Sequence, residues 1–183
     1  ASDLTVPATG TAYAVNLTAA TGTITNAVSF ANTGALILGQ AGGTLSFNGG
    51  VVATANSSRT IYGSILTSND LMSLGAIILG ADTVLDTGAT DGTGDLSVGA
   101  VTGAGFNLNL DTGHFAGANI SGTSISAVGT LTLVDAGTAT FTGSLGATTV
   151  AITDAVTLVD FQGALTASDL TVPATGTAYA VNL

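Results

Sequence analysis

Four aspartates near the middle of the chain are the residues best suited to hold a metal ion. Asp82, Asp86, Asp91 and Asp95 follow one another at short intervals, in a stretch rich in glycine and threonine. Hard cations such as Ca²⁺ take several oxygen ligands, and an acidic, glycine-rich loop can wrap around them. Calcium is therefore the one cofactor that the sequence indicates. A solvated acidic turn is the simpler interpretation of the same residues.

Two Asp-Thr-Gly triplets, beginning at Asp86 and Asp111, form a second arrangement of carboxylates. Each resembles the active-site loop of aspartic proteases, in which two carboxylates share one proton, and this resemblance implies an aspartic-type hydrolase. Those enzymes draw their two loops from separate lobes or subunits, whereas these triplets follow each other closely in one stretch of chain. Asp followed by Thr-Gly is also ordinary turn chemistry. We favour the turn interpretation, with the triplets at equivalent corners of neighbouring coils, and predict that the chain is not an enzyme.

The remaining chemically capable residues are few. His114 is the only histidine and the chain has no cysteine, so neither a histidine cluster nor a thiolate site can bind a transition metal. Nothing in the spacing suggests a Ser-His-Asp arrangement around His114. We expect His114 at the surface or at a corner. Arg59, the only lysine or arginine, is expected in an exposed loop, paired with an aspartate.

The amino-acid composition favours strands over helices and makes some classes of function improbable. Charged residues make up 7% of the chain and apolar residues 46%, and glutamate and lysine, both good helix formers, are absent. No convincing helix is predicted. The net charge of −10 with a single fixed cation disfavours nucleic-acid binding. No apolar run reaches the roughly 18 to 20 residues that a membrane span requires.

Short sequence motifs recur along the chain, and these motifs, which we call words, predict the architecture. Phe-x-Gly-small-Val/Leu-x-Ala-Thr/Ser occurs at residues 47–54, 141–148 and 161–168. The last two copies of this word, and likewise the two Asp-Thr-Gly words, are separated by roughly 20 to 25 residues, a spacing that fits one coil of a repeat protein. We therefore expect a parallel β-solenoid in which glycines form the corners. About seven to eight such coils fill residues 1–166 and advance roughly 34 to 38 Å along the axis, at about 4.8 Å per strand.

The words also predict which side chains form stacked core ladders. These candidate core positions are Phe47, Phe141, Phe161, Val51, Leu145, Leu165, Leu85 and Leu110. A tandem β-sandwich repeat is the competing architecture, and the scarcity of aromatic core residues argues against it. Thr-x-Thr stretches raise an ice-binding solenoid as a remote alternative, although their spacing is irregular and exposed threonine ladders also serve solubility.

The two ends of the chain carry the same seventeen residues, since Ala1–Leu17 returns unchanged as Ala167–Leu183. This predicts one complete repeat unit at 1–166 and the start of the next identical unit at 167–183. Repeats of this kind bury their core by stacking on a neighbour. The expected partners are therefore identical units, docked head to tail in a homopolymer or a laterally associated fibre.

The stretch GTLTLVDAGTATFTGSLGATTVAIT at residues 129–153 resembles the strand repeats of bacterial surface proteins of the filamentous-haemagglutinin-like and autotransporter-adhesin kind. The resemblance implies a right-handed β-helix, export to the cell surface, and adhesion or fibre formation. We therefore expect a non-enzymatic, secreted structural repeat that forms a rigid extracellular filament, sheath or stalk. An adhesive repeat that binds host or neighbouring-cell surfaces is the nearest alternative.

Overall fold

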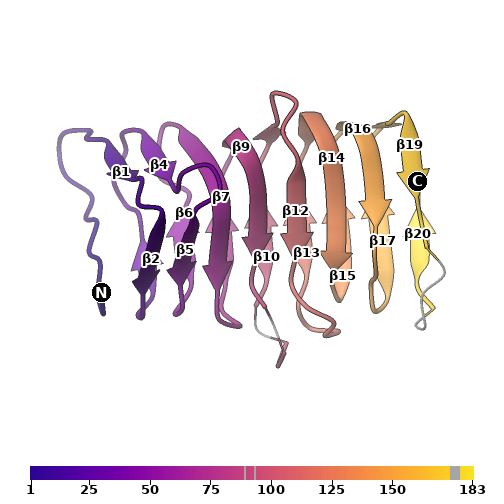
Figure 1. Ribbon diagram of the computed structural model, residues 1–183, viewed down its shortest axis with the longest axis horizontal. Coiled ribbons are helices and arrows are strands. Elements are labelled where there is room, and N and C mark those ends of the chain that lie inside the picture. Colours follow the sequence, from indigo (N-terminus) through magenta and orange to yellow (C-terminus); the bar gives the residue numbers. More distant parts are fainter. Residues whose placement is uncertain (89, 93, 174–177) are drawn as a thin grey trace.

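The computed structural model describes residues 1–88, 90–92, 94–173 and 178–183, and in these residues the chain winds as a parallel β-solenoid. Twenty strands form one 12-stranded and one 8-stranded sheet, and every pairing between strands is parallel. The described residues contain no helix. Figure 1 shows the strands side by side along the long axis, from the indigo N-terminal end to the yellow C-terminal end. The predicted solenoid is confirmed, and the antiparallel layers of a β-sandwich are not formed.

Each turn of the solenoid adds one strand to the 8-stranded sheet, which gives about eight turns. Its strands are β3 (Val28–Ser29), β6 (Val51–Ala53), β8 (Met72–Leu74), β10 (Leu96–Val98), β13 (Ile120–Gly122), β15 (Thr138–Phe141), β17 (Leu158–Phe161) and β20 (Ala180–Asn182).

The 12-stranded sheet covers the other two stretches of each turn, which we call its first and second rows. The first row holds β1 (Val15–Leu17), β4 (Leu36–Leu38), β11 (Val101–Thr102) and β18 (Leu165–Thr166). The second row holds β2 (Thr21–Ile24), β5 (Thr44–Phe47), β12 (Leu108–Asp111) and β19 (Asp169–Thr171). Four long strands run through both rows: β7 (Arg59–Thr67), β9 (Ile77–Asp86), β14 (Ile125–Asp135) and β16 (Leu145–Ile152).

Bends in the long strands separate the two rows. In β7 the bend lies at Gly63, where the register with β9 shifts and the backbone has φ of 66°. A side chain with this φ is strained. A Cβ atom at Gly63 would also lie 2.5 Å from the carbonyl oxygens of Gln40 and Gly43 on the coil below. Glycine is therefore required where the chain turns this closely over its neighbour.

Stacking in register turns the interior into continuous apolar ladders. Leu145 pairs with Ile125 on one side and Leu165 on the other, and Leu110 pairs with Leu85, so equivalent positions recur once per coil at the spacing that the words predicted. Of the eight candidate core positions, seven are buried, with at most 3% of their surface exposed. Leu165, in β18 at the end of the first row, is partly buried and packs against the same core.

The three Phe-containing words do not all lie at the same corner. Phe141 and Phe161 pair in β15 and β17, with stacked rings 5.8 Å apart, and both words then cross from the 8-stranded to the 12-stranded sheet. The word at Phe47 crosses in the opposite direction, from β5 to β6, and its ring meets Phe30 edge-on at 6.0 Å. An inward Phe, a Gly turn and an inward aliphatic residue suit either corner, because both corners join two buried strand ends.

Arg59 corrects the sequence-based expectation of an exposed loop. It begins β7 on an inward-facing ladder position, beside Leu36, and only 6% of its surface is exposed. Its guanidinium donates to the carbonyl oxygens of Ala53, Thr54 (2.7 Å), Asn56 (2.9 Å) and Ala76 (2.8 Å). Burial lowers the pKa of Arg59 from its usual value, because desolvation disfavours the charged form.

Space for this buried guanidinium comes from Gly75. A Cβ atom there would lie 2.7 Å from Nη2 and 2.8 Å from Cζ of Arg59. The ion pairs among the described residues do not include Arg59, so backbone carbonyls take the place of the expected aspartate. The only arginine of the chain thus ties the corner before β7 to the coil that follows.

Replacing Arg59 with alanine is expected to lower the free energy of unfolding by about 2–6 kcal/mol, because four carbonyl acceptors lose their donors at about 0.5–1.5 kcal/mol each. Arg59→Lys keeps the charge but lacks the planar guanidinium, so its free energy of unfolding should lie between those of wild type and Arg59→Ala. Urea unfolding followed by circular dichroism measures all three. A loss under about 0.5 kcal/mol for Arg59→Ala would show that the corner does not depend on this side chain.

Candidate functional site

Both Asp-Thr-Gly triplets close loops at the end of the second row. Gly88 N–H donates to Asp86 Oδ1 (2.6 Å), and Gly113 N–H donates in the same way to Asp111 Oδ1 (2.9 Å). Both glycines have positive φ, 57° and 75°. The backbones of Asp86 and Asp111 pair in register on neighbouring coils, as the sequence predicted.

The threonine of each triplet holds the far side of its loop. Thr87 and Thr112 are fully buried, and their hydroxyl groups donate to the carbonyl oxygens of Gly94 and Ala118, the latter at 3.0 Å. Aspartate, threonine and glycine therefore each have a structural part in closing the loop. This arrangement supports the turn interpretation of the triplets, since each carboxylate binds the N–H group of its own loop.

Stacking extends the two aspartates into a column of four, which we call the aspartate column: Asp86, Asp111, Asp135 and Asp154. Asp135 lies on the coil after Asp111 and pairs with it. Asp154 comes one coil later, where its N–H group donates to Val134 O (3.1 Å). Strands in such a sheet are about 4.8 Å apart, so the column concentrates negative charge along one edge of the second row.

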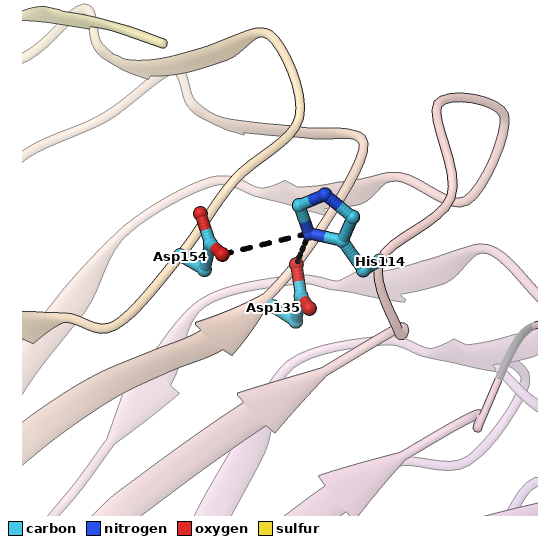
Figure 2. Close-up of side chains that lie close together, drawn as sticks. All are labelled: His114, Asp135 and Asp154. Atoms are coloured by element: carbon cyan, nitrogen blue, oxygen red, sulfur yellow. Dashed lines mark hydrogen bonds and ion pairs between the residues drawn. The ribbon is translucent and has the colours of Figure 1, made fainter. Parts of the chain in front are cut away.

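His114 reaches over this column from the Asp111 loop. Its Nδ1 atom lies 3.0 Å from Asp135 Oδ1 and 3.7 Å from Asp154 Oδ2, so one imidazole faces carboxylates from the next two coils (Figure 2). The three side chains are partly exposed, 42% for His114, 21% for Asp135 and 28% for Asp154. The expected surface position of His114 is correct, but its two carboxylate neighbours were not predicted.

The spacing of these three residues in the sequence is consistent with this cluster. Asp135 follows His114 by about one coil and Asp154 follows it by about two. Recognising that signal requires the register of coils that vary in length, and sequence words alone do not supply the register. In the part of the chain that the structure describes, these residues form the group of three His, Cys, Asp or Glu side chains whose ligand atoms all lie within 4.8 Å of one another.

The aspartates of the calcium prediction have different surroundings. Asp82 Oδ1 accepts from Asn107 N–H (2.9 Å), and Asp95 Oδ1 accepts from Asn119 N–H (2.8 Å), each on the following coil. Asp86 binds its own loop, and Asp91 lies exposed in that loop. These four carboxylates do not form a three-membered cluster among the described residues. Calcium binding there stays a prediction.

Asparagines continue the pattern that Asp82 and Asp95 begin. Asn107 Oδ1 accepts from Thr130 N–H (2.8 Å), and Asn119 Oδ1 accepts from Thr138 N–H (3.1 Å). Each of these Asp or Asn side chains therefore accepts a hydrogen bond from the backbone of the coil above. The polar residues at the corners extend the backbone ladder through positions where the strands are interrupted.

Burial and like charge act together on Asp111. Desolvation raises the pKa of its carboxyl above the usual value, and the charges of Asp86 and Asp135 raise it further, while the hydrogen bond from Gly113 lowers it. The group binds its proton more tightly in the folded chain than in the unfolded chain. Its ionisation therefore reduces stability as the pH rises above about 4.

Comparison of the chain with protein-family models, with curated proteins and with solved structures found no match. Within the described residues, no helix has the length and apolar character needed to cross a membrane. Function is therefore inferred from the solenoid and from its side chains.

Asp111→Asn is expected to raise the free energy of unfolding at pH 7 by about 0.5 kcal/mol. The neutral amide removes the repulsion within the column, while its oxygen can still accept from Gly113, and the gain is small because solvent screens a half-exposed group. The gain should disappear near pH 3, where Asp111 is protonated in both states. Urea unfolding at several pH values tests this, with Asp160→Asn as a control outside the column. A variant less stable than wild type at pH 7 would contradict the expected repulsion.

Proposed function

We propose that this chain is a non-enzymatic structural repeat of a long extracellular surface protein, in which stacked units build a rigid filament, sheath or stalk. The support comes from a solenoid held together along its whole length by hydrogen bonds between coils. Such a rod carries load along its axis without covalent cross-links. Its small hydroxylated surface residues and net charge of −10 suit a hydrated environment.

The observation that carries this proposal is that the outermost strands at both ends of the described solenoid pair with another strand on one side only. At the N-terminal end this is true of β1 and β2, although the backbone of Ala1 covers part of β2 through hydrogen bonds with Thr23 and Thr25. Among the described residues of the C-terminal end it is true of β18, β19 and β20. Unpaired strand edges are templates for pairing with another chain. Parallel strands added at either end would continue the two sheets.

Apolar side chains are exposed at the same two ends. Leu170 in β19 pairs with the fully buried Val150, so it continues an inward-facing ladder. Even so, 38% of its surface is exposed, because no strand among the described residues pairs with β19 on its other side. At the opposite end an apolar hollow includes Leu4, Leu17 and Ile24. Contact between the two ends would bury both apolar surfaces and restore the ladder across the junction.

Identical units meeting head to tail are the partners that these ends favour, and the duplicated segment supports a unit that spans residues 1–166. The resemblance to bacterial surface repeats supports export and a place outside the cell. In an adhesin, similar stacked units would form the stalk, and binding to host or neighbouring-cell surfaces would need contacts beyond those that hold the rod together.

Self-association through the ends is tested with two variants that carry the same change. Leu170→Asp places a charge on the uncovered ladder, while Ile78→Asp places one on an outward position of β9 in the middle of the rod, where Ile78 is 45% exposed. Concentrated wild-type chain and Ile78→Asp should form rods longer than one unit in negative-stain images, and Leu170→Asp should remain single units. The expected axial repeat is roughly 34 to 38 Å.

Before the images are compared, circular dichroism should show that both variants keep the wild-type fold. Single units for the wild type at all concentrations, or equal assembly of both variants, would contradict docking through the ends. Binding of the monomeric chain to cell surfaces, undiminished in Leu170→Asp, would favour the adhesive alternative over the filament.

A further inference from the structure

We propose that His114, Asp135 and Asp154 bind a first-row divalent transition-metal ion, with Zn²⁺ as the ion that suits them best. The three side chains supply one imidazole nitrogen and two carboxylate oxygens. Histidine nitrogen and aspartate oxygen are both ligand types that Zn²⁺ accepts, and a site with three protein ligands leaves the fourth position of its tetrahedral shell to water. Ca²⁺ prefers oxygen ligands alone, and the chain has no thiolate to attract softer ions.

The distances between ligand atoms agree with the edges of a zinc coordination shell. Zn–N and Zn–O bonds of about 2.0–2.2 Å in a tetrahedron place neighbouring ligand atoms roughly 3.3–3.6 Å apart. Nδ1 of His114 lies 3.0 Å from Asp135 Oδ1 and 3.7 Å from Asp154 Oδ2 (Figure 2). All three ligand atoms lie within 4.8 Å of one another, so rotation of the two carboxylates toward the imidazole would bring them onto one ion.

Hydrogen bonds outside the cluster hold its ligands in place. Asp154 Oδ1 accepts from Ala155 N–H (2.8 Å), which leaves Oδ2 toward the imidazole. The loop that carries His114 is fixed on one side by Gly113 N–H to Asp111 Oδ1 and on the other by the Thr112 hydroxyl to Ala118 O. Thr112 N–H also donates to Asp135 O (2.9 Å), which ties this loop to the coil of the second ligand. Such supporting contacts are typical of metal sites.

Charge favours a cation at this position. Two ligands belong to the aspartate column, and Asp111 lies beside Asp135 on the preceding coil. Unit charges 4 Å apart repel by about 1 kcal/mol even in water, and by more near a protein surface. A protonated His114 offsets one negative charge, whereas a divalent ion bound to the neutral imidazole offsets two.

Bound metal would join three successive coils along the axis. His114 follows β12, Asp135 ends β14 and Asp154 follows β16, so the ion would lie across the edge of three stacked strands of the second row. This metal site does not depend on the proposed function, because it concerns side chains of a single unit. In a rod, one such ion in each unit would add a side-chain cross-link parallel to the backbone hydrogen bonds.

The test measures Zn²⁺ binding to the full chain by isothermal titration calorimetry at pH 7.5, with protein made without a polyhistidine tag. Wild type should bind one Zn²⁺, and its thermal unfolding midpoint should rise with Zn²⁺ concentration. His114→Gln and Asp154→Asn should each weaken binding at least tenfold. Asp160→Asn removes the same charge from β17, outside the cluster, and should bind within twofold of wild type.

A second measurement identifies the ligand atom directly. Because His114 is the only histidine, the imidazole ¹⁵N signals of the chain are unambiguous, and Zn²⁺ should shift Nδ1 strongly. An unshifted imidazole, or Zn²⁺ affinity equal in wild type and His114→Gln, would overturn the proposal. Either result would assign the cluster to contacts between the imidazole and the two carboxylates alone.

Discussion

The structure depends on one constraint, the parallel hydrogen bonding of each coil to the coil above and below in a fixed register. A single coil cannot bury its own apolar side chains. Stacked in register, successive coils cover one another, and Leu, Ile, Val and Phe form ladders through the interior. The corners obey the same constraint, because Asp82, Asp95, Asn107 and Asn119 pass hydrogen bonds to the next coil where the strands are interrupted.

Register has opposite consequences for apolar and charged residues. An aliphatic ladder gains from stacking like on like, since each side chain is covered by an equivalent one. An aspartate column stacks like charges. Burial raises the pKa of Asp111, and the charges of Asp86 and Asp135 raise it further. The arrangement is tolerable because the column lies at an edge with access to solvent, and because His114 leans across it toward Asp135 and Asp154. The chemically distinctive part of the molecule is therefore a result of stacking.

Much of the fold could be predicted from the sequence, and the reasons are local. The lack of glutamate and lysine, the strand-length apolar segments and the regular spacing of the repeated words indicated a parallel solenoid, and Leu85 with Leu110 and Phe141 with Phe161 do pair. The word at Phe47 was grouped with these although it turns a different corner. The sequence predicts Arg59 at the surface because charged side chains usually lie there. Its burial is possible because four carbonyl oxygens accept its hydrogen bonds and Gly75 leaves space for the guanidinium.

The duplicated segment separates what the sequence determined from what only the tertiary structure decided. The seventeen residues are identical, yet Val15–Leu17 pairs with β4 in the 12-stranded sheet, while Ala180–Asn182, from the second copy, pairs with β17 in the 8-stranded sheet. Residues 174–177 of that copy lie outside the described residues. Composition and alternation alone determined that such a segment forms a short strand. The sheet that the segment joins depends on the neighbouring coil, because that coil supplies its hydrogen-bond partners and the apolar surface that it covers. The same is true of the residues that contact His114 and Arg59.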